Sequence, residues 1–398
     1  MIYKSCIIGL LLSAVALHAE AVELNKEGRD PAYVESIVNR SKKIVDKLGI
    51  SDQKKADDVT TIIANRYFKL NDIYTARDAK VKSAKETLTG DAKNEAVQAA
   101  QNEKDAALYR SHFEFPADLS LYLTPEQIDA VKDGMTYGVV KVTYDSHLDM
   151  IPTLTDEEKA QIMAWLIEAR ELAMDAETYK SCIIGLLLSA VALHAEAVEL
   201  NKEGRDPAYV ESIVNRSKKI VDKLGISDQK KADDVTTIIA NRYFKLNDIY
   251  TARDAKVKSA KETLTGDAKN EAVQAAQNEK DAALYRSHFE FPADLSLYLT
   301  PEQIDAVKDG MTYGVVKVTY DSHLDMIPTL TDEEKAQIMA WLIEARELAM
   351  DAETSNKKHE VFGKYKGRIN NYLAKRGYDL KKEREAWYER IKARGGTI

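Results

Sequence analysis

The chain contains a perfect internal repeat. Residues 3–178 recur letter for letter at 179–354, an offset of 176 residues. Ordinary repeats diverge outside their core and turn positions, so complete identity indicates a very recent tandem duplication, a cloning event or a gene-assembly product. Collapsing the repeat leaves a unit of 398 − 176 = 222 residues that ends in a tail, residues 355–398. We expect one such ancestral unit, and the alternative is a true two-domain protein.

The N-terminus has the pattern of a secretory signal peptide. Lys4 supplies a positive charge, residues 6–17 are apolar, and residues 19–21 read Ala-Glu-Ala, a small-x-small cleavage site. We therefore expect cleavage after Ala21 and a periplasmic or secreted protein. The apolar run is too short for a comfortable membrane span, so no stable span is expected in the mature unit.

These boundaries divide the chain into four parts. They are the signal peptide (1–21), a first copy of the domain without its own tail (22–178), a duplicated signal-like segment (179–197), and a second copy with its tail (198–398). The first copy carries 21 basic and 29 acidic residues, whereas the tail carries 13 basic and 5 acidic residues. We expect the basic tail to dock on the acidic body, which leaves the first copy incomplete. A basic patch for an anionic ligand is the alternative.

Helical periodicity dominates each unit. Only 8 prolines and 17 glycines occur in 398 residues, which argues against a turn-dense β-sandwich. Apolar residues recur at helical spacing over 34–48 and 59–73, and a turn at 89–91 separates two Ala- and Lys-rich stretches. The sequence therefore predicts an all-α helical bundle with a long helical hairpin.

Two segments of the unit are predicted to be non-helical. Phe113, Phe115 and Pro116 interrupt the helical pattern and predict an aromatic loop reaching residue 122. Residues 137–144 alternate apolar and polar side chains, which predicts a short strand or extended segment.

The sequence contains no strong catalytic or cofactor motif. Glycine-rich phosphate loops, HExxH, CxxC and GxSxG are all absent, and two cysteines cannot build a disulfide framework or a thiolate zinc site. A net charge of −8 argues against binding to nucleic acid. His147 lies between Asp145 and Asp149, but we favour a hydrogen bond over a general base. No catalytic residue, cofactor or metal site is predicted.

Two stretches, 165–175 and 364–373, combine aromatic, charged and amide side chains. Amide and guanidinium groups beside an aromatic ring can hold sugar hydroxyls, although the same rings could simply be core residues beside a solvated face. The candidate ligand-binding residues are Trp341, Arg346, Glu347, Asp351, Tyr365, Lys366, Arg368, Asn370, Asn371 and Tyr372, with Trp165, Arg170, Glu171 and Asp175 at the matching positions of the first copy.

Three runs carry a resemblance to a known family: MTYGVVKVTY, MIPTLTDEEKAQIMAWLIEAREL followed by AMDAE, and KKHEVFGKYKGRINNYLAKRGYDL. They resemble a domain-of-unknown-function family of secreted proteins from polysaccharide-degrading Gram-negative bacteria, which is described as sugar-binding. The resemblance covers residues 30–178 and the tail. It implies a secreted protein that binds carbohydrate, and it supplies no catalytic residue. With the basic tail, it makes an acidic polysaccharide a candidate ligand for a non-catalytic binding protein.

Two other functions stay open. Residues 123–127 and 154–158 resemble the LTxxQ repeats of small periplasmic helical chaperones, although they are also good helix caps. Paired carboxylates could serve a carbohydrate-active enzyme, but such pairs arise by chance on a charged helical surface. The sequence makes no prediction of oligomeric state.

Overall fold

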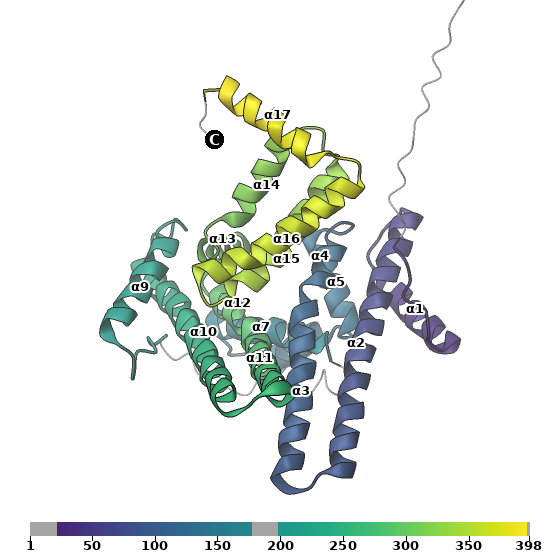
Figure 1. Ribbon diagram of the computed structural model, residues 1–398, viewed down its shortest axis with the longest axis vertical. Coiled ribbons are helices and arrows are strands. Elements are labelled where there is room, and N and C mark those ends of the chain that lie inside the picture. The colour runs from purple at the N-terminus through teal and green to yellow at the C-terminus, as the bar shows by residue number, and fades with distance from the viewer. Residues whose placement is uncertain (1–21, 177–197, 396–398) are drawn as a thin grey trace, which may run out of the picture.

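All regular secondary structure in the described residues, 22–176 and 198–395, is helical in the computed structural model (Figure 1). This confirms the predicted all-α fold. The predicted signal peptide (1–21) and its copy (179–197) lie outside the described residues. The first copy contains α1 (Pro31–Val45), α2 (Gln53–Thr87), α3 (Gly90–His112), α4 (Glu114–Leu119), α5 (Pro125–Met135), α6 (Val139–Met150) and α7 (Asp156–Ala173).

The second copy repeats these helices and adds two from the tail. Its helices are α9 (Pro207–Val221), α10 (Gln229–Thr263), α11 (Gly266–His288), α12 (Glu290–Ser296), α13 (Pro301–Met311), α14 (Val315–Met326), α15 (Asp332–Met350), α16 (Ser355–Lys375) and α17 (Leu380–Ala393). The predicted long hairpin is confirmed as α2–α3 and as α10–α11.

Local sequence signals set the helix boundaries. The Asp30 carboxylate accepts a hydrogen bond from the backbone N–H of Tyr33 at 2.9 Å, and Pro31 occupies the first helical turn of α1. Thr124 and Thr155 begin α5 and α7 with capping boxes that use Gln127 and Glu158. The residues that resemble chaperone repeats therefore serve here as helix caps.

Both segments predicted to be non-helical contain helix. Residues 113–122 contain α4, and residues 139–150 form α6 rather than a strand. The strand prediction was wrong because Val140, Tyr144 and Leu148 recur every four residues and share one apolar cluster, largely on α7. That helical period continues beyond the alternating segment, and burial against α7 outweighs the β-propensity of the valines.

The two copies pack on each other with exchanged, equivalent contacts. Helices α3 and α11 lie side by side at the centre of the molecule (Figure 1), and α4 packs on α15 as α12 packs on α7. One apolar cluster contains Tyr109 and Phe113 of the first copy together with Tyr285 and Phe289 of the second. The copies are therefore related by a pseudo-two-fold axis.

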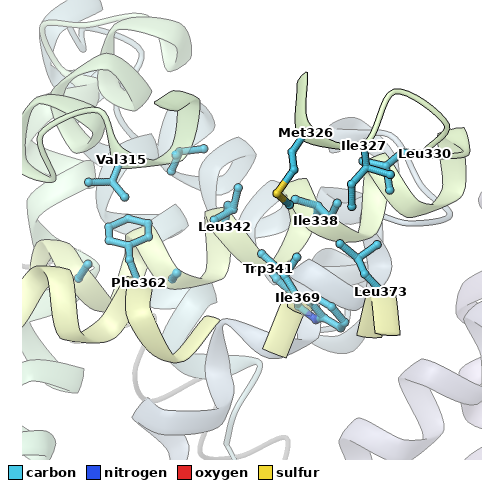
Figure 2. Packing of buried hydrophobic residues seen from close by; sticks show 13 residues of the cluster. Val315, Met326, Ile327, Leu330, Ile338, Trp341, Leu342, Phe362, Ile369 and Leu373 are labelled. Atoms are coloured by element: carbon cyan, nitrogen blue, oxygen red, sulfur yellow. The ribbon is translucent and has the colours of Figure 1, made fainter. Parts of the chain in front are cut away.

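The tail covers one face of the second copy. Helix α16 packs along α15, and α17 lies across α14. Figure 2 shows Phe362 and Ile369 of α16 against Val315 and Trp341, residues with which they share a buried cluster. The predicted docking of the tail on the body therefore occurs on the second copy.

Candidate functional site

An open pocket of about 350 Å³ lies on the first copy. Its walls come from the segment before α1, from α2 and from α4. The residues that line it include Asn25, Arg29, Asn65, Lys69, Asp72, Glu114 and Asp118. Most of these groups are polar or charged, and the volume falls within the usual range of about 300–1,000 Å³ for ligand sites.

Hydrogen bonds to α2 hold the segment before α1 in place. The Asn65 side chain accepts from the backbone N–H of Asn25 at 2.9 Å and donates to the Glu23 carbonyl at 2.8 Å. Arg29 makes two hydrogen bonds to the Asp72 carboxylate, at 2.8 and 2.6 Å. The amide of Asn65 and the guanidinium of Arg29 therefore build the wall, whereas the Asn25 side-chain amide has no hydrogen-bond partner among the described residues.

Two carboxyl groups one helical turn apart on α4 point to the chemistry of the pocket. Glu114 forms an ion pair with Lys69. Burial, reinforced by the negative charges of Glu114 and Glu344, raises the pKa of Asp118 to about 7. No side-chain hydrogen bond to Asp118 exists within the described residues. A carboxyl that is partly protonated at neutral pH can donate a hydrogen bond as well as accept one.

Outside the pocket lining, Glu344 on α15 of the second copy acts electrostatically on Asp118 and is itself held by the tail. Glu344 acts on the pKa of Asp118, and its carboxylate accepts hydrogen bonds from Tyr365 at 2.8 Å and Arg368 at 3.2 Å. Burial raises the pKa of Glu344, and these two tail groups oppose that rise. The Arg368 guanidinium also lies 4.5 Å from the Trp341 ring centroid, so the stacking partner of this tryptophan is a protein side chain.

A sister pocket, also of about 350 Å³, occupies the equivalent place on the second copy. Its lining includes the carboxyl groups of Asp248 on α10 and of Glu290 and Asp294 on α12. Glu168 of the first copy is the counterpart of Glu344 and interacts electrostatically with Glu290 and Asp294. Burial raises the pKa of Asp294 to about 6 and that of Glu168 to about 7, in each case with help from Glu290. The first copy has no tail, and Glu168 has no hydrogen-bond partner among the described residues.

Two of the predicted site residues, Asp175 and Asp351, lie in the interior. Asp175 is fully buried and forms an ion pair with Arg66, and one of its oxygens is 2.8 Å from His112 Nδ1. Tyr285 of the second copy donates to the same oxygen at 3.0 Å, and Asp351 makes the matching set of contacts, including one with Tyr109 of the first copy. These aspartates join the two copies and do not face the pocket.

The predicted arginine–glutamate pairs are also structural. Arg346 binds Asp305 at 2.6 Å and Asp309 at 2.9 Å, and Glu347 pairs with Lys308 at 2.9 Å. Their counterparts Arg170 and Glu171 make the equivalent contacts in the first copy. These charges tie α13 to α15 and α5 to α7.

The remaining candidates divide between the pocket and the surface. Tyr365 and Arg368 bind Glu344, whose charge acts on Asp118 of the first pocket, whereas Lys366 and Asn371 are exposed on α16. The rest lie elsewhere on the tail face: Asn370 is half-buried, and Tyr372 contacts Trp341 edge to face, while Trp165 stays half-buried. Sequence analysis did not identify Asn25, Lys69, Glu114 or Asp118. The sequence shows Glu114 and Asp118 four residues apart, a spacing that would put them on one face of a helix, but the residues around them predicted a loop.

The fold and pockets define an all-α protein with two copies of one domain and a polar pocket on each copy, beside α4 or α12. A family model matches residues 34–184 and 210–393, one match for each copy. The chain therefore belongs to the family described as protein of unknown function (DUF3826). No curated protein matches the chain.

Two further observations concern membranes and metal ions. In the described ranges, no helix combines the length and apolarity that crossing a bilayer requires. No group of three or more histidine, cysteine, aspartate or glutamate side chains within residues 22–176 and 198–395 is arranged to hold a metal ion.

Proposed function

We propose that the chain is a secreted or periplasmic, non-catalytic carbohydrate-binding protein that serves polysaccharide use, and that its ligand occupies the first pocket. The observation that carries the proposal is the gathering of different hydrogen-bonding groups in one open cavity. Asp118 both donates and accepts near neutral pH, the Asn25 amide does the same, and Glu114 accepts. A sugar hydroxyl also donates and accepts, so such a set matches a polyhydroxylated ligand better than an apolar one.

Calorimetric titration of the full chain with neutral and uronic-acid oligosaccharides tests this proposal. We expect saturable binding of one class, weakened at least about 10-fold, or about 1.4 kcal/mol, by Asp118→Ala combined with Glu344→Ala. Because the pKa of Asp118 is raised to about 7, its donor proton is lost as pH rises, and affinity should fall above pH 7. Asn371→Ala, on the exposed face of α16, is the matched control and should leave affinity unchanged.

Two outcomes would contradict the proposal. Loss of binding in Asn371→Ala, together with full binding in the double variant, would move the ligand from the pocket to the outer face of α16. Absence of a saturable signal with every oligosaccharide class would contradict carbohydrate binding itself.

Acid catalysis at the same carboxyl groups is a second candidate function. It is favoured by Asp118, whose raised pKa makes it a possible general acid, beside the ion-paired carboxylate of Glu114. If this function holds, the chain should release reducing sugar from its bound oligosaccharide at a rate that declines above pH 7. Asp118→Asn should abolish the release and retain binding. Equal rates in wild type and Asp118→Asn would exclude this role.

A further inference from the structure

One face of the first copy has the sequence of a binding surface that is occupied on the second copy. The side chain of Met326 is 8% exposed beneath the tail, whereas its counterpart Met150 is 69% exposed. Among the residues that are buried under the tail of the second copy, seven others have half-buried identical counterparts in the first copy. These counterparts are Val139, Thr143, His147, Ile151, Glu158, Trp165 and Glu168. With Met150, we call this set the open tail face.

Directional polar contacts hold the tail on the second copy. Glu334 accepts hydrogen bonds from Arg376 at 3.1 Å and Tyr378 at 2.7 Å. Trp387 donates to the Asp325 carboxylate at 2.7 Å, and Arg390 donates to the Met326 carbonyl at 2.9 Å. Every one of these acceptors has an identical counterpart in the first copy, at positions 158, 149 and 150. The open tail face therefore carries the acceptors as well as the apolar residues.

A buried lysine adds a further contact. Lys358 of the tail is 4% exposed, and its ammonium donates to the carbonyls of Met311 and Met350 at 3.1 Å each. These carbonyls end α13 and α15, where the negative end of the helix dipole favours a cation. Helix α5 ends at the matching Met135, and Met174, which matches Met350, directly follows the last residue of α7 as its C-cap. The charges also match, because the tail carries 13 basic and 5 acidic residues and residues 22–178 carry 21 basic and 29 acidic residues.

We propose that the open tail face binds residues 355–395 of a second copy of this chain, in the pose that α16 and α17 adopt on the second copy. Sequence identity between the two faces selects this occupant, since one face already holds it. Docking would place Tyr365 and Arg368 beside Glu168. Glu168 would then have the same two hydrogen-bond partners that Glu344 has on the second copy. Each chain has two such faces and one tail, so filling both requires additional tail. The proposal does not depend on the ligand of either pocket.

A chain with a second tail tests the proposal. Residues 355–395 are inserted after Thr178, which reproduces the junction at Thr354 and gives the tail a high local concentration. In the parent chain, Met150→Asp should leave Tm unchanged because the side chain is 69% exposed. In the inserted chain we expect the same substitution to lower Tm by several degrees, since a carboxylate would be buried under α17.

Val142→Asp is the matched control. Val142 and its counterpart Val318 are both 65% exposed, so the docked tail does not cover this position. Its substitution should leave Tm unchanged in the parent and in the inserted chain. The proposal is overturned if Met150→Asp has the same effect in both backgrounds, or if Val142→Asp lowers Tm of the inserted chain as much as Met150→Asp does.

Binding in trans provides an independent measurement on the full natural chain. A fluorescent peptide of residues 354–395 is titrated with the chain and followed by anisotropy. We expect saturation, an affinity at least about 10-fold weaker with Met150→Asp, and no change with Val142→Asp. Absence of saturable binding, or unaltered affinity with Met150→Asp, would overturn the proposal.

Discussion

Single buried carboxylates connect the two copies of this molecule. Asp175 brings together Arg66 and His112 of its own copy and Tyr285 of the other. Burial alone would raise the pKa of Asp175, but the charges of Arg66 and His112 outweigh it and lower the pKa to about 2. The carboxylate therefore stays ionised in the interior, and its partners fix the relative position of the two copies.

Asp175→Asn should destabilise the chain by about 3–5 kcal/mol, because it leaves the buried Arg66 guanidinium without its counter-charge. Asp72→Asn is the matched control, since it breaks another arginine–aspartate pair whose aspartate is 57% exposed, and should cost less than about 1 kcal/mol. Urea unfolding at neutral pH measures both. Equal losses of unfolding free energy would contradict the assignment of the buried network.

The same network predicts how stability depends on pH. The pKa of Asp175 lies below its ordinary value of 3.8, so its contribution is complete above that value and is lost as pH falls toward 2. Asp175→Asn should therefore flatten this part of the acid-side stability curve.

At the residue scale, sequence reasoning found side chains with the right chemistry but not their surroundings. Arg346 and Glu347 are on one helix with Trp341, and Asp351 is the C-cap of that helix. Spacing alone does not show that most of the helix is covered. Glu114 and Asp118 were missed because Phe113, Phe115 and Pro116 suggest a loop. Pro116 lies in the first turn of α4, where its lack of an N–H is tolerated.

The helices themselves were largely predictable because their signals are local. Asp30 with Pro31, and the capping boxes at Thr124 and Thr155, mark helix starts in the sequence and in the structure. The strand prediction for residues 137–144 failed because both the two-residue period of a strand and the helical period fit such a short segment. The choice between them depends on packing against α7, which lies more than ten residues away.

A tightly packed glycine on α5 and an unobstructed glycine on α16 should respond in opposite ways to substitution by alanine. A Cβ on Gly134 would lie 2.8 Å from Cγ2 of the buried Ile44, whereas a Cβ on Gly367 of α16 would meet nothing within 4 Å. Gly134→Ala should therefore cost about 1–3 kcal/mol through overpacking. Gly367→Ala should stabilise the chain by about 0.5–1 kcal/mol, because alanine favours a helix interior. Thermal unfolding of both variants checks the contrast, and equal shifts in Tm would contradict it.

At the scale of the whole molecule, the contact between copies was beyond sequence reasoning. Identity of the copies reveals the repeat, but not which helix of one meets which helix of the other. Arg110 reaches Asp281 at 3.0 Å and Arg286 reaches Asp105 at 3.1 Å, although each pair is more than 170 residues apart. In a single unit these residues would be unremarkable charges on one helix.

The equivalence of these contacts predicts that a one-unit chain, residues 198–398, associates as a homodimer. Light scattering should give twice the mass of one unit. Arg286→Asp should place like charges together and reduce the mass to that of the monomer. Asp281→Arg in the same chain should restore the dimer by exchanging the charges. Failure of this rescue would contradict the pairing, and a monomeric parent unit would contradict the interface.

The exchanged contacts between α3 and α11 also limit how the gene could grow. Each domain uses this contact surface, on α3 or α11, to bind the other domain. The pair is therefore closed, and no equivalent surface is left to bind a further domain. In a third tandem domain, the residues equivalent to Tyr109 and Phe113 would be exposed, because no other domain of the same polypeptide would be free to pack on them. Arrays of this domain should therefore be stable in even numbers, and odd-numbered chains should pair with one another.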